Sequence, residues 1–222
     1  MRKIIPVILL IIVTNSLLAQ RKVSFGLTFS PAISWMKGQA SEVEKGKIKS
    51  AFEYGILADI NFADNYALHT GITGMLSGGS LNFTDYILQR SDSLNPSVKF
   101  KFQYINVPLA LKLKTNEIGY VTYYGLFGMM TSIRIAARAD TKIGGIVMDE
   151  NENIIGNDIE GISSNLLNLS LHIGGGIHYA ISGNTMLLAG FFYNGGFLNV
   201  IKDVDGDKIS LSNVGLRVGI IF

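Results

Sequence analysis

Val214-Gly-Leu-Arg-Val-Gly-Ile-Ile-Phe222 is the stretch that decides the fold. Its apolar residues alternate with small or polar ones, so they would share one face of an extended strand. The apolar face comprises Val214, Leu216, Val218, Ile220 and Phe222, and the opposite face comprises Asn213, Gly215, Arg217 and Gly219. This period of two residues predicts a β-strand whose apolar face ends in an aromatic residue.

The same alternation recurs along the chain and predicts eight strands, over residues 23–35, 51–62, 66–78, 98–114, 119–135, 167–182, 185–197 and 208–222. The segments between them alternate between long and short: 36–50, 63–65, 79–97, 115–116, 136–166, 183–184 and 198–207. An up-and-down barrel with both termini in the periplasm needs short turns there and longer loops outside. The sequence therefore predicts an all-β protein, an eight-stranded antiparallel up-and-down transmembrane β-barrel.

Aromatic residues fall near both ends of these strands. They are Phe25, Phe62, Tyr66, Tyr120 and Phe222 at the periplasmic end and Trp35, Phe52, Tyr54 and Tyr193 at the other end. Aromatic girdles at the two membrane interfaces are typical of membrane barrels. The alternative is a soluble barrel or sandwich whose apolar faces point inward. The polar faces opposite the apolar ones favour the membrane barrel.

Composition agrees with this interpretation. Hydrophobic residues make up 48% of the 222 residues and charged residues only 16%, yet no stretch after the amino terminus approaches the length of an apolar membrane helix. The 25 glycines and 12 phenylalanines suit a curved, aromatic-girdled sheet.

The amino terminus carries an export signal. Arg2 and Lys3 precede an apolar run over residues 4–13, and Ala19 ends a short stretch that predicts cleavage. We therefore expect a signal peptide over residues 1–19 and one barrel domain over residues 20–222; the alternative is a membrane-spanning helix at residues 4–13. The chain has no cysteine, which excludes a lipoprotein anchor, disulfides and thiolate metal sites.

Net charge gives no indication of a nucleic-acid partner. Without Arg2 and Lys3, 17 of the 19 basic residues remain, against 17 acidic ones. The mature chain is formally neutral, whereas nucleic-acid binding needs a clustered excess of positive charge.

Three irregularities interrupt the alternation. Val98 to Tyr104 place their apolar side chains at even positions, whereas Ile105 to Leu113 place them at odd ones. Either a β-bulge lies near Tyr104 and Ile105, or the first half extends beyond the bilayer with its aromatics turned inward. A second slip is expected between Leu211 and Val214. Pro108 lacks an N–H, so we expect a local break in the ladder there.

Tyr104-Ile105-Asn106-Val107-Pro108-Leu109 resembles a mid-barrel signature of the PorT-like outer-membrane β-barrel family. The glycine-rich Gly174-Gly175-Gly176-Ile177 and the aromatic-ended last strand resemble the same family. The resemblance implies a barrel in the Gram-negative outer membrane, and members include a component needed for type IX protein secretion. The aromatic carboxyl end also resembles the signal read by the barrel-assembly machinery, so that machinery and outer-membrane lipid are expected partners.

Five charged residues fall on the inward face of the predicted barrel: Glu53, Asp59, Lys112, Arg134 and Arg217. Unpaired charges inside a barrel are unfavourable, so the sequence predicts a polar plug. Asp59 and Arg217 lie at similar heights on the strands flanking the first strand, and small residues between them leave room for the arginine. We therefore predict a contact between Asp59 and Arg217.

Other constellations are weaker. His69, His172 and His178, with Ser170 two residues from His172, allow the hypothesis of a lipid-modifying enzyme, although no carboxylate adjoins them in sequence. Asp203-Val-Asp-Gly-Asp207 resembles the start of a calcium loop, but Lys208 and Val214 replace its sixth and twelfth ligand-loop residues. The acidic run over residues 149–153, with Asp158 and Glu160, allows the hypothesis of cation binding, although a solvated loop fits it better.

These observations favour a non-enzymatic outer-membrane barrel with a filled lumen and no catalytic, cofactor or metal site. Long loops on a rigid scaffold commonly carry function. We therefore expect action through extracellular loops or the periplasmic rim, in protein interaction or secretion-system support, with a secretion or surface protein as partner. The alternatives are a lipid-modifying enzyme and a small-solute pore.

Overall fold

A computed structural model describes residues 23–38, 43–45, 47–83, 97–143, 146–153, 163–202 and 208–222. The expected signal peptide, residues 1–19, lies outside the described residues. Within the described part, no helix is long and apolar enough to cross a membrane.

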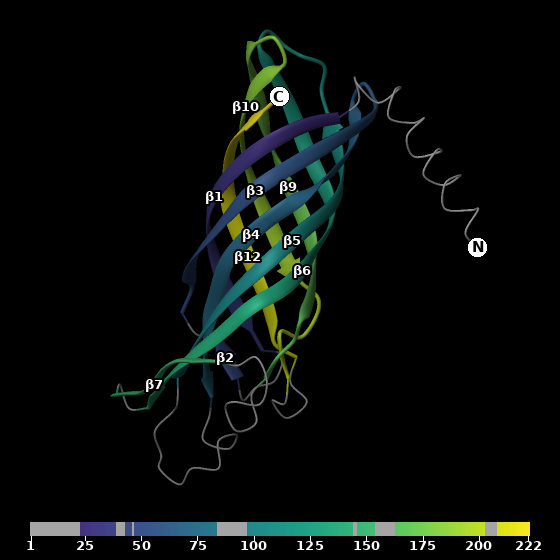
Figure 1. The fold of residues 1–222 in the computed structure, drawn as a ribbon. Helices are drawn as coiled ribbons and strands as arrows, with labels where there is room; N and C mark the ends of the chain where they lie inside the picture. The colour runs from purple at the N-terminus through teal and green to yellow at the C-terminus, as the bar shows by residue number, and fades with distance from the viewer. Residues whose placement is uncertain are drawn as a thin grey trace, which may run out of the picture.

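Eight long antiparallel strands, steeply tilted relative to the barrel axis, close into a barrel (Figure 1). They are β1 (Val23–Lys37), β3 (Lys49–Ala63), β4 (Tyr66–Phe83), β5 (Ser97–Lys114), β6 (Val121–Ile143), β9 (Leu167–Ser182), β10 (Thr185–Gly196) and β12 (Ser210–Ile221). Each pairs with its neighbours in chain order, and β1 pairs with β12 to complete the ring. Phe25 and Phe222 exchange two backbone hydrogen bonds of 3.0 and 2.8 Å at this seam. The predicted eight-stranded barrel is confirmed.

The two ends of the barrel differ. At the short-turn end, tight connections such as the one between β9 and β10 join the strands. At the long-loop end, β4 and β6 continue several residues beyond the predicted positions 78 and 135. Four short strands add to this end: β2 (Val43–Lys45) pairs with β4, β7 (Ile146–Asn153) pairs with β6, and β8 (Ser163–Ser164) pairs with β11 (Ile201–Lys202).

The outer surface carries the apolar face that the alternation predicted. Leu216, Val218, Ile220 and Phe222 of the last strand are exposed, as a lipid-facing surface requires. Aromatic side chains also meet on this surface near both ends. The rings of Phe62 and Tyr66 stack at the short-turn end, and those of Trp35 and Tyr193 stack at the long-loop end, each pair with centroids 6.3 Å apart.

Two expected parity slips have a different explanation in the structure. In β5, even positions point inward along the whole strand, so the interior holds Val98, Phe100, Phe102 and Tyr104 as well as Asn106 and Lys112. The second alternative, inward-turned aromatics, is therefore the one confirmed. A bulge does occur here, but on β6: Gln103 pairs with Ala136 and Tyr104 with Arg134, which leaves Ile135 unpaired.

The expected slip before Val214 is wrong. The pairing of β12 with β1 and with β10 keeps one register throughout, and Leu211 points inward with Asn213 and Arg217. Leu211 is apolar because the interior itself becomes apolar at its level, and not because the strand changes face.

Pro108 interrupts the ladder on one edge only. Its pairing with β6 is regular, from Val107 opposite Thr131 to Leu109 opposite Met129. On the other edge, the pairing with β4 stops at Asn106 and resumes at Ala110. Because a proline has no N–H to donate, this gap of three residues is the predicted local break.

Candidate functional site

The lumen is the first place to look for a site, and its long-loop half is closed by an apolar cluster. We call it the lumen cluster; it comprises Met36, Ala51, Met75, Leu81, Val98, Phe100, Phe102, Tyr104, Ala137, Ala139, Val200, Ile201, Ile209 and Leu211. All of these side chains are buried. An eight-stranded barrel is narrow enough for side chains to fill it, and here they do.

Loop residues seal the mouth of this cluster. Val200, Ile201 and Ile209 insert their side chains from the connection between β10 and β12. The Asn199 side-chain oxygen accepts hydrogen bonds from the backbone N–H of Ile201 and of Ile209, at 3.3 and 3.0 Å. The Asn165 amide donates to the Asn199 carbonyl at 2.6 Å. The loops therefore form a hydrogen-bonded cap.

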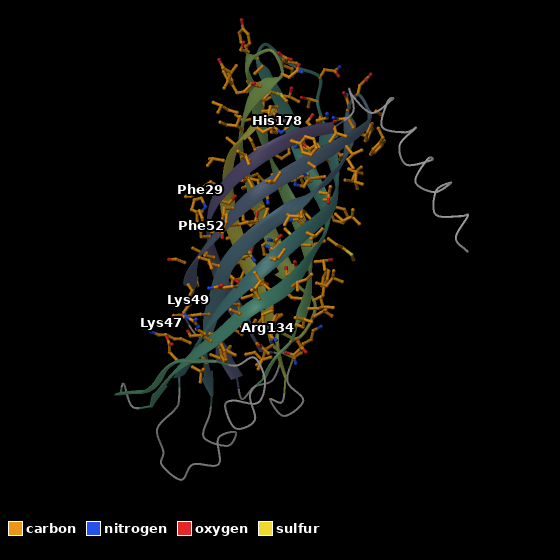
Figure 2. The ribbon with its side chains drawn as sticks, in the orientation of Figure 1. Phe29, Lys47, Lys49, Phe52, Arg134 and His178 are labelled. Atoms are coloured by element: carbon orange, nitrogen blue, oxygen red, sulfur yellow. The ribbon has the colours of Figure 1, made fainter. Side chains whose placement is uncertain are left out.

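Arg134 connects the barrel wall to the cap. Its guanidinium bonds the backbone and side-chain oxygens of Ser164, and its backbone N–H donates to the carbonyl of Leu166 at 2.8 Å. Figure 2 shows Arg134 near the loops and His178 near the opposite end of the barrel. Arg134 faces inward as predicted, but its partner is a loop and not another lumen charge.

Below the lumen cluster lies a buried ion pair. Arg217 on β12 donates to the Glu53 carboxylate on β3 at 3.0 Å, and both side chains are almost completely buried. The register explains this pairing. Phe29 lies opposite Val218, so Ser30 falls beside Arg217, and Ser30 is also paired with Glu53.

A chain of amides crosses the lumen from this pair. The Asn106 amide donates to Glu53 at 3.2 Å and to the sulfur of Met75 at 3.6 Å. The chain continues through Asn213, which bonds the same sulfur at 3.8 Å, through Asn194, which donates to Asn213 at 2.8 Å, and ends at His172, whose Nδ1 lies 2.5 Å from Asn194 Oδ1. Because these residues come from six strands, the network spans the whole cross-section.

A second charged group lies nearer the short-turn end. The Asp59 carboxylate accepts a hydrogen bond from Lys112 at 2.5 Å and lies 2.6 Å from Nδ1 of His69. The Lys112 ammonium also sits 4.6 Å from the centre of the Tyr124 ring, which packs against the imidazole of His178.

The predicted contact between Asp59 and Arg217 is not made directly. Asp59 pairs with Lys112 and His69, and Arg217 pairs with Glu53, although Asp59 and Arg217 line the same small cavity. The reason is the stagger of the strands. Ser24, the β1 residue opposite Asp59, lies six positions before Ser30, the residue beside Arg217. The four buried charges therefore form two neutral pairs.

A second group of buried apolar side chains lines the same small cavity as these charges. They are Leu57, Tyr124, Leu126, Leu188 and Ile221. The cavity between these side chains and the charged groups is small, with space for about one water molecule. Solute passage would therefore require the interior to rearrange.

The hydrolase candidates are not brought together as a dyad. Ser170 donates to the carbonyl of Met130 at 3.4 Å, whereas His172 contacts Asn194, and no hydrogen bond joins Ser170 to His172. His69 does have a carboxylate partner, Asp59, but both side chains are buried inside the lumen. Acid–base chemistry on a lipid would require the lipid carbonyl to reach the His69 and Asp59 side chains.

Most of the loop candidates lie outside the described residues. Residues 203–207, with their calcium-like spacing, lie outside the described residues, as do Asp158 and Glu160. The acidic run at residues 149–153 belongs to the backbone of β7. Among the described residues, no group of three or more His, Asp or Glu side chains is placed to hold a metal ion.

Sequence reasoning placed the charged residues on the inner face but missed their partners. Asn106, Asn194 and Asn213 also fall on inward positions, and that shared parity is the signal that could have identified the crossing network. The apolar cluster was signalled by the even-numbered aromatics of β5.

Most of the chain matches a known protein family. Residues 16–202 match the family described as outer membrane protein β-barrel domain. The chain belongs to this family. The localisation is accordingly the outer membrane. A search of curated protein sequences found no match.

Solved outer-membrane barrels resemble this family member at low sequence identity. Neisserial surface protein A is 16% identical, with 89% of this chain and 95% of that chain covered and a TM-score of 0.45. OprG from Pseudomonas aeruginosa is 12% identical, with 90% and 97% covered and a TM-score of 0.45. The outer membrane protease OmpT from Escherichia coli is 10% identical, with 91% and 96% covered and a TM-score of 0.40.

Proposed function

We propose that this chain is a non-enzymatic outer-membrane barrel that acts through its loops or its periplasmic rim, in protein interaction or in support of a secretion system. The observation that carries this proposal is the filled interior: an apolar cluster, a network across the lumen and a second apolar layer. Such an interior leaves the loops and rims as the surfaces open to partners.

The PorT-like resemblance supports the secretion role within this family. The segment from Tyr104 to Leu109 lies in mid-strand, with Tyr104 and Asn106 facing the lumen and Ile105 and Leu109 facing outward. Its proline interrupts only the edge that faces β4. This segment therefore shapes the wall, and we assign the interaction itself to the loops or the rim.

The two alternative functions have less support. A small-solute pore needs an open lumen, whereas Glu53, Arg217 and the amides from Asn106 to Asn194 cross this one. A lipid-modifying enzyme needs a nucleophile beside a base, and Ser170 and His172 do not bond.

Affinity capture from outer membranes tests the proposal. Full-length protein is compared with one variant in which residues 84–96 are replaced by a two-residue turn and another in which residues 115–120 are shortened. We expect a stable protein partner that one of the two variants loses, which tells loop from rim. Turnover of phospholipid by the purified barrel, or capture that both variants leave unchanged, would contradict it.

We further propose that the last strand engages the barrel-assembly machinery through its terminal aromatic. The Phe222 side chain is exposed while its backbone bonds Phe25, so Phe222→Ala removes the ring and keeps the seam. We expect less folded protein in outer membranes but an unchanged refolding yield in detergent. Equal membrane levels for both chains would count against this partner.

A further inference from the structure

A small cavity lies beside the Asp59 ion pair, and we call it the plug cavity. Its lining includes Ser24, Asp59, His69, Lys112 and Arg217. Apart from Ser24, these side chains are almost completely buried. Figure 2 places His178, whose imidazole packs against the cavity residue Tyr124, toward the end of the barrel opposite the loops. The plug cavity therefore lies in the polar half of the lumen, where an occupant meets charged and imidazole groups.

Two nitrogen atoms of this lining have hydrogen-bonding capacity that the described residues do not use. They are Nε2 of His69 and Nε of Arg217, and both atoms are buried. Neither side chain can turn toward a new partner without losing its present one. His69 Nδ1 lies 2.6 Å from the Asp59 carboxylate, and Arg217 Nη2 donates to Glu53 at 3.0 Å. Because a buried polar atom without a partner is unfavourable, the two nitrogens indicate a ligand in the cavity.

The protonation of His69 decides which ligand fits. Lys112 already neutralises Asp59, so a charged imidazole would leave this buried group with a net positive charge. We therefore assign a neutral imidazole whose Nδ1 donates its hydrogen to Asp59. Its Nε2 is then an acceptor, whereas Nε of an arginine is always a donor. The ligand must donate to one nitrogen and accept from the other.

Water meets both requirements. A chloride ion accepts from Arg217 but donates nothing to His69, and the Lys112 and Arg217 charges repel a metal ion. The plug cavity has room for about one water molecule, so size and hydrogen-bonding chemistry agree. Buried waters make about three hydrogen bonds, and the Ser24 hydroxyl in the lining offers a third partner.

Gly26 of β1 keeps this space open. It lies in the lining, paired with Leu57 of β3 and with Ile221 of β12. A Cβ at this position would lie 3.1 Å from the carbonyl oxygen of Ile220 and 3.2 Å from Cγ1 of Ile221. A side chain there would therefore take cavity space and press on the last strand.

Polar side chains lead from the short-turn rim to the cavity. The Lys114 ammonium donates to Asn61 Oδ1 at 2.6 Å, and the Asn61 amide donates to the Ser24 hydroxyl at 3.5 Å. Ser24 lines the cavity and is paired with Asp59. In the other direction, the ion pair of Arg217 and the lumen cluster close the interior. A water molecule in the cavity therefore exchanges with the short-turn side.

We propose that the plug cavity binds one water molecule, which accepts a hydrogen bond from Arg217 Nε and donates one to His69 Nε2. The water joins the group around Asp59 to the pair of Glu53 and Arg217. The two neutral pairs then form one polar plug, in which a change to either pair affects the other. This goes beyond the proposed interaction function, because it concerns how the lumen is closed and not what the loops bind.

Nuclear magnetic resonance of the full-length chain, labelled with ¹⁵N-histidine and reconstituted in detergent micelles, tests the site directly. We expect His69 to carry its hydrogen on Nδ1 and its ring protons to receive magnetisation from a bound water. Replacing chloride in the buffer by sulfate should leave this water signal unchanged. A hydrogen on Nε2, the absence of a water signal at His69, or a signal that depends on chloride would contradict the proposal.

Three variants separate the bound water from overall stability. E53Q/R217M removes the donor without leaving a buried carboxylate unpaired, and Gly26→Ala takes cavity space without touching a charged residue. Both should lose the water signal at His69. Leu211→Ala, which lies in the lumen cluster and outside the cavity lining, should keep it. A signal that either of the first two retains, or that Leu211→Ala loses, would overturn the assignment of the water to this cavity.

A double-variant cycle measures whether the two ion pairs act as one plug. D59N/K112M and E53Q/R217M each replace one pair, and the fourfold variant replaces both. If the water joins the pairs, the change in the unfolding equilibrium constant of the fourfold variant should differ by more than about twofold from the product of the two separate changes. Agreement within about twofold would show that the pairs are independent, which contradicts a joined plug.

Discussion

The two halves of the lumen differ in polarity. At the level of the lipid-facing surface, the interior holds two ion pairs, amides and imidazoles. Toward the loops, it holds Phe100, Phe102, Leu211 and other apolar side chains, while Lys99, Lys101 and Gln103 face outward on β5. The difference indicates what surrounds each half. Inside lipid, the outer face must be apolar and the inner face is free to be polar. Beyond lipid, water surrounds the barrel, and the apolar residues move to the interior as in a soluble protein.

Breaking an ion pair in the polar half should have the largest effect. Glu53→Gln leaves Arg217 buried without its charge partner and should lower the free energy of unfolding by about 3–5 kcal/mol. Urea unfolding in lipid vesicles, followed by Trp35 fluorescence, measures the change. The double variant E53Q/R217M should recover most of the loss. A single-variant loss below about 1 kcal/mol would mean that the charges do not form a buried pair.

The apolar half is tested on the last strand. Leu211→Ala should lower the free energy of unfolding by about 2–5 kcal/mol, because Leu211 is packed in the lumen cluster. Leu216→Ala, five residues on and facing lipid, is the matched control and should lose less than about 1 kcal/mol. If Leu216→Ala lost more stability than Leu211→Ala in the same unfolding assay, Leu211 would not face the lumen, and the parity slip expected from the sequence would stand.

The boundary between the halves depends on a close approach of strands. The Ser34 hydroxyl donates to the Gly78 carbonyl at 2.5 Å and accepts from the Gly78 N–H at 3.0 Å. A Cβ on Gly78 would lie 2.1 Å from the carbonyl oxygen of Phe100, so Gly78→Ala should destabilise by about 1–3 kcal/mol. Gly125→Ala, where nothing lies within 4 Å, should be close to neutral. Equal effects would indicate that the strands do not pack this tightly.

The cap should show the smallest effect. Asn199→Ala removes the acceptor for the N–H groups of Ile201 and Ile209 and should destabilise by about 1 kcal/mol. Hydrogen exchange of those two amides should accelerate, while the amides of β9 should be unchanged. Uniform acceleration across the barrel would show that the cap and the wall unfold as one unit.

The sequence predicted the fold well because lipid imposes a simple pattern. All eight strands lie where the alternation placed them, and β9 matches residue for residue. The pattern was misinterpreted where lipid ends. The sequence offered two explanations for Val98 to Tyr104, and it assigned a slip to Leu211, because alternation alone does not show which face meets water.

Partners inside the lumen were harder to predict. Parity placed Glu53, Asp59, Lys112 and Arg217 correctly inside. The pairing of Arg217 with Glu53 depends on the register of β12 with β1 and of β1 with β3, which sequence alternation does not contain. Loop contacts such as Arg134 with Ser164 depend on tertiary folding of a connection with no regular period.

Conductance across a planar lipid bilayer tests the central claim, a barrel whose interior is closed along its length. Purified full-length protein should insert without discrete current steps above the lipid baseline, because the layer from Arg217 through Glu53 and Asn106 to His172 crosses the lumen. Stepwise currents that persist over minutes in the parent protein would contradict the closed interior and favour the pore.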